Sequence, residues 1–472
     1  MKKSVKLLMS LAAISLLGGA VTGCGGSTNC PECPECPDTP VTPDEDKSGA
    51  ILNIRCWNNE FQNRFRSYYP DYVKTEGDYD ILRDGTKVKW IIVANDGGAY
   101  QTALDEALKN QDSVKDDEKV DIFLSEADYI TKYKDSEYTL DVIKDVGLST
   151  SDINDQYAYT QEVATSSSGS LKGVTWQAAP GLFAYRRDLA KKVFGTDDPV
   201  KVQEQLSSWD KFNAAAAKAK EKGVYMLSGY DDSYRTYSNN MGQKWVSDDG
   251  VLSIAPKMKQ WVDDTKNFVD KGYCGTSTLW SGQWAADQGP NGNPVLGFFY
   301  STWGINFTLL GNSLADSSAP QQVGNGLFGQ YAVCEGPESY YWGGTWIHAA
   351  KGTDNIKQIK DIMLNLTCSR TVMSSITKIE QDYTNTVSGM DTIANDKSFG
   401  SAFLGGQNHI ALFAKSAAKI DCSNMSGYDQ ACNEGFQNAM HDYFAGTVTY
   451  EKALANFKST ISEKHPEVTF NF

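Results

Sequence analysis

The sequence predicts an α/β protein of two lobes with a cleft between them. Its 472 residues exceed what one compact hydrophobic core usually organises, so a division into two lobes is expected. Short buried strands alternate with amphipathic helices along the chain, which is typical of open, largely parallel sheets with helices on both faces. An aromatic content of 11% excludes a disordered chain, because disordered segments lack the large side chains that build a core.

The first 23 residues have the layout of a secretory leader. Three lysines precede the uncharged, mostly apolar stretch Leu7–Ala20, and the small residues Val21–Gly23 directly precede Cys24. This tetrad resembles the lipobox of bacterial lipoproteins, which implies cleavage before Cys24 and a diacylglyceryl group, with palmitate, on this cysteine. An ordinary leader followed by a chance cysteine is the alternative. No other segment approaches ~20 apolar residues, so the lipid would be the only membrane anchor.

Residues 24–49 are expected to form a stiff tether. Proline recurs at every third position from Pro31 to Pro43, which is the repeat of an extended polyproline II helix. Cys30, Cys33 and Cys36 share this period and would line one edge of the helix. We interpret the segment as a repeat-expanded spacer with incidental thiols, with a metal or disulfide edge as the alternative. Three thiolates along a rod cannot close a tetrahedral zinc site, so we predict no metal and no cofactor.

The body begins with strand–helix–strand units. Strands are predicted at Ile51–Trp57, Val88–Ala94 and Val120–Leu124, and a helix at Tyr100–Asn110 carries its apolar side chains on one face. Such units favour an open, largely parallel sheet.

A second series of elements begins near Gly173. Strands are predicted at Leu182–Tyr185, Val295–Tyr300 and within Tyr340–Ala350, and helices at Trp209–Lys222, Lys257–Lys271, Ile356–Leu366, Ile410–Ile420, Asp429–Phe444 and Tyr450–Lys464. We assign residues 50–172 and 340–380 to an N-lobe, and residues 173–339 and 381–472 to a C-lobe.

Six cysteines remain in the body, and an exported protein permits disulfides. Cys422 and Cys432 flank a turn-rich segment and are the preferred pair, and Cys274 with Cys334 is a second candidate. Buried free thiols are the alternative, above all for Cys56 and Cys368, which lie in apolar patterns.

Charge and motifs exclude several function classes. A net charge of −15 argues against nucleic acid as a partner, because a nucleic-acid-binding protein concentrates positive charge. The usual hydrolase, nucleotide-binding and zinc-protease motifs are absent. The stretch Gly324–Gly329 matches a dinucleotide-binding pattern but leads into a strand instead of a helix, so we interpret it as a turn. A pair of glycosidase carboxylates stays possible, because its spacing is a matter of three-dimensional structure.

Five segments in order carry a family resemblance. They are TWQAAPGLFAYRRDLAKKVFGTDDP (175–199), SSWDKF (207–212), YYWGGTWIHAAKGT (340–353), FLGGQNHIALFAKSA (403–417) and DYFAGTVTYEKALANFKS (442–459). With the leader upstream, the chain from Ile51 to Phe472 resembles the carbohydrate-binding lipoproteins of bacterial ABC transporters, the extracellular solute-binding proteins of family 1. The maltodextrin- and oligosaccharide-binding type is the nearest comparison.

This resemblance implies the two-lobed periplasmic-binding-protein fold and no enzymatic activity. It further implies a monomer anchored by lipid to the outer face of the cytoplasmic membrane, which captures an oligosaccharide and delivers it to the permease subunits of an ABC transporter. The family's cleft acids are matched only in part, by Asn58, Asn59, Glu60, Glu126 and Asp128.

Sugar chemistry selects candidate ligand-binding residues independently. A pyranose ring presents apolar C–H faces and a girdle of hydroxyls, so it needs aromatic platforms and planar hydrogen-bonding side chains. The chain holds 11 Trp, 24 Tyr and 19 Phe, more than core packing needs. The candidates lie at strand exits, at lobe crossings and, for the last two, before a helix. They are Trp57, Asn58, Glu60, Glu126, Asp128, Trp176, Gln177, Asp231, Trp303, Tyr340, Trp342, Gln407 and Asn408. Core positions are expected for Trp90, Trp209, Trp261, Trp280 and Trp284.

Two function classes follow, and a third is weaker. The first is a binding protein that captures an oligosaccharide without breaking a bond. The second is a surface glycoside-active enzyme with a carboxylate pair in its cleft. A peptide or polyamine binder of similar architecture is the third, and the aromatic surplus disfavours it.

Overall fold

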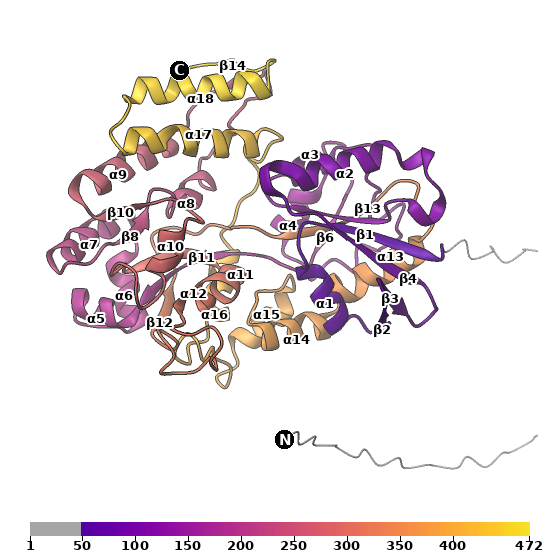
Figure 1. Cartoon of the computed structure of the whole chain (residues 1–472), viewed down its shortest axis with the longest axis horizontal. Coiled ribbons are helices and arrows are strands. Elements are labelled where there is room, and N and C mark those ends of the chain that lie inside the picture. The colour runs from indigo at the N-terminus through magenta and orange to yellow at the C-terminus, as the bar shows by residue number, and fades with distance from the viewer. Residues whose placement is uncertain (1–48) are drawn as a thin grey trace, which may run out of the picture. The chain divides into compact units, whose positions relative to one another are not determined.

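The computed structural model describes residues 49–472 (Figure 1). The predictions for the leader, for Cys24 and for the edge of Cys30, Cys33 and Cys36 concern residues outside this range. The described part is a mixed α/β protein, as predicted.

One sheet has seven strands, in the order β2-β3-β4-β1-β5-β13-β6. Its centre is β1 (Ile51–Cys56), which pairs in parallel with β4 (Lys87–Ile92) on one side and β5 (Ile122–Glu126) on the other. These are the three strands predicted for the start of the body. The remaining strands are β2 (Tyr72–Glu76), β3 (Tyr79–Leu82), β6 (Val174–Thr175) and β13 (Thr345–Ala349).

The prediction of largely parallel sheets is wrong for this sheet's edges. Strands β2, β3 and β4 pair antiparallel because tight turns join them, with Gly77 and Gly85 at positive φ. Strand β13 is also antiparallel to its neighbours β5 and β6. It follows the residues of the second sheet in the chain and enters the first sheet from the opposite end.

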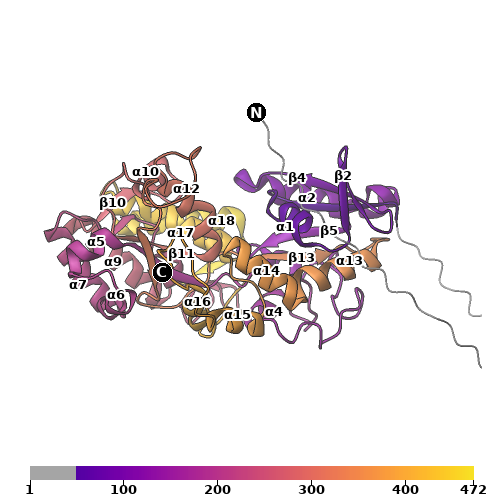
Figure 2. The same cartoon turned by 90° about the horizontal axis from the view of Figure 1, so that it is seen from below.

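The second lobe contains a three-stranded sheet that is wholly antiparallel. Strand β7 (Gly181–Arg186) lies between β11 (Gly297–Ser301) and β12 (Tyr331–Cys334). Strands β8 (Leu227–Gly229) and β10 (Cys274–Ser277) form a small parallel pair nearby. Figures 1 and 2 show helices such as α7 and α9 around these strands, while α1 and α2 flank the seven-stranded sheet.

The helices with clear apolar periodicity form as predicted. They are α2 (Ala99–Lys109), α7 (Trp209–Glu221), α9 (Pro256–Lys271), α13 (Ile356–Met363), α16 (Ile410–Ala417), α17 (Asp429–Phe444) and α18 (Tyr450–Lys464). Helix α9 shows the local reason clearly, since it begins with Pro256 and ends at Gly272 in the left-handed conformation. Helices α17 and α18 stack at the C-terminal end of the chain (Figure 1).

The described part has further α-helices and β-strands. They are α1 (Glu60–Tyr68), α3 (Ile130–Lys134), α4 (Ala158–Ala164), α5 (Arg187–Phe194), α6 (Pro199–Leu206), α8 (Tyr234–Ser238), α10 (Gly282–Asp287), α11 (Thr302–Gly304), α12 (Leu310–Ser313), α14 (Arg370–Glu380), α15 (Val387–Ala394), β9 (Val251–Leu252) and β14 (Thr469–Phe470). Residues 324–329 form turns with three glycines at positive φ before β12, which confirms that this pattern is no dinucleotide-binding motif.

All six cysteines of the body are free thiols, so the preferred pair Cys422–Cys432 and the second candidate pair Cys274–Cys334 are both wrong. Cys422 belongs to the large core cluster beside the sheets, whereas Cys432 lies on α17 in a separate cluster around Trp245 and Trp261. Cys274 and Cys334 lie on strands of different sheets. Cys56 and Cys368 are free thiols, which agrees with the alternative given for these two cysteines in the sequence analysis.

A close contact at the start of β7 predicts a destabilising substitution. A Cβ atom on Gly181 would lie 2.1 Å from Cζ of Tyr340, a buried ring whose hydroxyl donates to the Leu182 carbonyl. We expect Gly181→Ala to lower the free energy of unfolding by about 1–3 kcal/mol, because the ring has no free space to enter. Denaturant unfolding measures this. Gly282→Ala is the control, because no atom lies near that position, and its stability should be unchanged or slightly higher. Equal stability of both variants would contradict the expectation.

Candidate functional site

A cavity of about 710 Å³ lies between segments of the two lobes. Its size falls in the range of small-molecule sites. One part of its lining follows strands of the seven-stranded sheet, and another part follows β10, β11 and β12. It is therefore placed where the sequence predicted a cleft.

The wall from the seven-stranded sheet is polar. The segment after β1 contributes Trp57 through Glu60, helix α1 contributes Asn63 and Arg64, and the end of β5 contributes Glu126 and Asp128. Because β1 and β5 are adjacent and parallel, their carboxyl ends meet at one edge of the sheet. This topology brings residues 57–64 and 126–128 together.

The wall built from residues that follow β10, β11 and β12 is aromatic. Trp303 lies on α11 directly after β11, and its indole N–H donates to the Trp342 carbonyl over 2.7 Å. Trp280 lies nearly parallel to Trp303, with ring centroids 6.3 Å apart. Gly343 lets the Trp303 indole lie against the backbone at residues 342–343. It has φ 78°, and a Cβ atom there would lie 2.8 Å from the indole nitrogen of Trp303.

A carboxylate cluster surrounds Arg64. Its guanidinium is 2.9 Å from Glu380 and 3.8 Å from Asp382, both lining the cavity. Glu60 lies beside this cluster and accepts a hydrogen bond from the Gln177 amide over 2.7 Å. Burial, and secondarily the charge of Asp382, raises the pKa of Glu60 to about 7.

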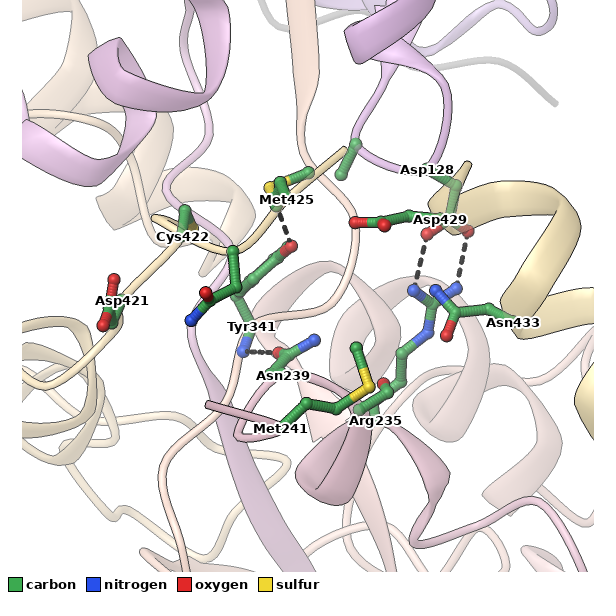
Figure 3. A pocket seen from close by; sticks show the side chains of 13 residues that line it. Asp128, Arg235, Asn239, Met241, Tyr341, Asp421, Cys422, Met425, Asp429 and Asn433 are labelled. Atoms are coloured by element: carbon green, nitrogen blue, oxygen red, sulfur yellow. Dashed lines mark hydrogen bonds and ion pairs between the residues drawn. The ribbon is translucent and has the colours of Figure 1, made fainter. Parts of the chain in front are cut away.

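A second polar cluster joins the two lobes (Figure 3). Arg235 on α8 donates to both carboxylate oxygens of Asp128 over 2.5 Å. Glu126 lies next to this pair and accepts the backbone N–H of Asp128 over 2.7 Å. Burial, and then the charge of Asp128, raises the pKa of Glu126 well above its ordinary value.

The structure brings eight of the thirteen candidate residues to this cavity. They are Trp57, Asn58, Glu60, Glu126, Asp128, Gln177, Trp303 and Trp342. They come from separate strand exits and crossings, which supports the reasoning that polar and aromatic side chains at those positions face the cleft.

The other five candidates do not line the cavity. Trp176 is buried and stacks on Phe61. Tyr340 is buried against β7. Asp231 accepts hydrogen bonds from the backbone of Leu279 and from the ring of His441. Gln407 pairs with the backbone of Val333, and Asn408 donates to carbonyls at the end of α15. Each of these side chains satisfies structural hydrogen bonds or fills core volume.

Several lining residues escaped the sequence reasoning. They are Asn63, Arg64, Arg235, Leu279, Trp280, Asn306, Phe307, Glu380 and Asp382. The core position expected for Trp280 is wrong, since the residue has φ 66° in the turn before α10 and is 56% exposed. Trp261 and Trp284 are buried as expected. Of these residues, Arg64 alone could have been found from the local sequence. It lies one helical turn after the candidate Glu60, so both side chains share one face of the helix.

Within residues 49–472, no group of His, Cys, Asp and Glu is arranged to hold a metal ion. In the same range, no helix is both long enough and apolar enough to cross a bilayer.

Comparisons with known proteins point to one family. A family model described as bacterial extracellular solute-binding protein matches residues 83–371, more than half of the chain. No curated protein matches the chain by sequence.

Solved structures share the fold at low identity. A crystal structure titled extracellular solute-binding protein family 1 is 14% identical, with a TM-score of 0.68 over 87% of this chain and 99% of that one. The ABC transporter-associated binding protein of B. animalis subsp. lactis, in complex with β-1,6-galactobiose, is 15% identical, with a TM-score of 0.64 over 90% and 100% of the chains. The galacto-N-biose/lacto-N-biose I-binding protein of Bifidobacterium longum, in complex with lacto-N-biose, is 14% identical, with a TM-score of 0.64 over 90% and 100%. The likeness confirms the predicted two-lobed fold.

Proposed function

We propose that this chain captures an oligosaccharide in its interlobe cavity and delivers it to the permease subunits of an ABC transporter. The chain belongs to the bacterial extracellular solute-binding protein family. The observation that carries the proposal is the pairing of an aromatic wall with a polar wall. Trp280 and Trp303 offer indole rings for the apolar side of a sugar, and the carboxylates and amides of the polar wall offer acceptors and donors for its hydroxyls.

Equilibrium titration with a panel of oligosaccharides tests the proposal. We expect at least one di- to tetrasaccharide to bind with a 1:1 stoichiometry and to be recovered intact after incubation. A glycoside-active enzyme would shorten the sugar, so chromatography of the recovered ligand separates the two functions. Failure of every saccharide to bind would overturn the proposal.

We further propose that the lobes divide as inferred from the sequence, with residues 50–172 and 340–380 in one and 173–339 and 381–472 in the other, except that β6 belongs to the first lobe because it pairs with β13. We also propose that the protein acts as a monomer. The crossings lie side by side, since Gln177 bridges Thr384 and Pro180 bridges Tyr341. A narrow set of neighbouring crossings suits a hinge.

This hinge predicts closure on binding. We expect small-angle scattering to give a smaller radius of gyration with a saturating sugar than without it, because the two walls approach the ligand from different lobes. The same protein with a sugar that does not bind in titration is the control. Identical profiles with the cognate sugar would contradict a hinged clamp.

We also propose that Cys24 carries a lipid that holds the protein at the outer face of the cytoplasmic membrane. Cys24→Ala should move the protein from the membrane fraction to the soluble fraction without lowering its melting temperature, because the residue precedes the folded body. Fractionation of cells expressing each form, with Cys30→Ala as the matched control, measures this. A Cys24→Ala variant that still partitions with membranes would count against the anchor.

A further inference from the structure

The charges that line the interlobe cavity do not balance. Five carboxylates line it, those of Glu60, Glu126, Asp128, Glu380 and Asp382. Among residues 49–472, two cationic side chains line the same cavity, those of Arg64 and Arg235. At full ionisation the lining is therefore strongly negative, and an anionic ligand would meet repulsion from it.

Both guanidinium groups are already engaged. Arg235 holds Asp128 through two hydrogen bonds of 2.5 Å. Arg64 contacts Glu380 at 2.9 Å and Asp382 at 3.8 Å. These contacts compensate the acids nearest to each arginine.

Glu60 and Glu126 accept hydrogen bonds from neutral groups, and the charges of Arg64 and Arg235 act on them only from farther away. Glu60 accepts from the Gln177 amide, and Glu126 accepts from the backbone of Asp128. Among the described residues, neither of these two carboxylates has a cationic side chain at 4 Å or closer. Burial raises the pKa of both groups, so keeping them ionised in the cavity costs free energy that a cation could offset.

The two carboxylates share one edge of the sheet. Glu60 follows β1 and Glu126 ends β5, and these strands are adjacent and parallel. Trp57 lines the same cavity and packs edge-on against Tyr129 at 6.0 Å. An indole in a cavity lined by carboxylates suits a cationic ligand, through cation–π attraction.

We propose that the oligosaccharide bound here is built of amino sugars, whose protonated amines are held by Glu60 and Glu126. This inference rests on the proposed function and narrows its substrate class to cationic saccharides. Hydroxyls of the same ligand would bind the remaining amides and carboxylates, and its apolar ring faces would pack on the tryptophans.

Matched ligands test the charge. Calorimetry at pH 6, where a sugar amine is protonated, would compare di- and trisaccharides of glucosamine and galactosamine in several linkages with their N-acetylated and 2-hydroxyl counterparts. We expect the best free-amine ligand to bind at least ~10-fold more tightly than its two neutral counterparts. Its binding enthalpy should also vary with the ionisation enthalpy of the buffer, because binding an ammonium group releases protons from the carboxyls.

The outcomes separate this inference from the proposed function. Equal or tighter binding of the neutral counterparts would overturn the inference and leave oligosaccharide binding intact. Binding of spermidine with no saccharide bound would overturn the proposed function and the amino-sugar assignment together. If no free-amine saccharide binds, the inference is likewise overturned.

Variants of the two carboxylates complete the test. Glu60→Gln and Glu126→Gln keep the side-chain shape and remove the charge, so each should reduce the ratio of free-amine affinity to neutral-counterpart affinity by ~10-fold. Glu106→Gln, an exposed position on α2, is the charge-matched control and should leave the preference unchanged. Thermal melts identify variants that fail to fold. A preference that survives in folded Glu60→Gln and Glu126→Gln proteins would overturn the assignment.

Discussion

Trp303→Ala is expected to weaken binding of the cognate oligosaccharide by ~30- to ~1000-fold, or roughly 2–4 kcal/mol, the range of an aromatic hot spot. The indole lines the cavity directly after β11, and a hydrogen bond from its N–H to the Trp342 carbonyl fixes its orientation. A platform held in place in this way loses little conformational entropy when a sugar packs on it.

The same substitution should affect stability much less. Trp303 is only half-buried, so its removal opens no closed core cavity, and we expect a loss of about 1 kcal/mol. Trp261 is the matched comparison, because it is fully buried, and Trp261→Ala should cost about 3–5 kcal/mol. Trp303→Phe keeps a ring face but removes the donor to Trp342, so its affinity should lie between those of the wild type and Trp303→Ala.

Two measurements decide this prediction. Titration calorimetry gives the affinity for the cognate sugar, and a thermal melt without sugar gives the stability. If Trp303→Ala binds normally and melts far below the wild type, Trp303 is a core residue and does not belong to the site.

The sequence predicts elements best where the apolar pattern is local. The strands at Ile51–Cys56 and Ile122–Glu126 and the helix at Pro256–Lys271 follow from runs and periodicities within a few residues. Sheet direction is a different matter. Whether β13 runs parallel or antiparallel to β5 depends on where the chain has travelled in the second lobe, and no pattern within Thr345–Ala349 records that path.

Site residues show the same division. The polar residues after β1 and β5 could be placed because the carboxyl ends of parallel strands are the usual ligand edge. Arg235 could not be placed, since its partner Asp128 lies 107 residues away in the other lobe. Gln407 has the right chemistry for a sugar, but its amide pairs with both backbone groups of Val333. Composition alone does not distinguish a side chain that pairs with backbone from one that faces a cavity.

A second large effect is expected from breaking the ion pair between Asp128 and Arg235. It joins α8 of one lobe to the loop after β5 of the other. Removing one partner of a buried ion pair typically costs about 3–5 kcal/mol. Here the side chains are 21% and 31% exposed, so solvent screening reduces the expected cost to about 2–3 kcal/mol.

We expect the loss of this ion pair to destabilise the arrangement in which the two lobes are closed on each other. In Arg235→Gln, Asp128 loses its charged partner and lies beside Glu126, so the two carboxylates repel each other. The ligand-free variant should therefore have a larger radius of gyration than the wild type. Its affinity for the cognate sugar should fall by ~30- to ~100-fold, because binding must then supply the free energy of closure.

A double-mutant cycle separates the ion pair from other roles of Arg235. Asp128→Asn combined with Arg235→Gln removes both charges, so the double variant should be less open than Arg235→Gln alone, with a coupling of at least ~1 kcal/mol. Arg83→Gln is the control, because Arg83 pairs with Asp71 on the surface, where both side chains are largely exposed. If the scattering profile of Arg235→Gln matches that of the wild type, the pair does not hold the lobes together. Any loss of affinity would then come from direct contact between Arg235 and the sugar, since Arg235 itself lines the cavity.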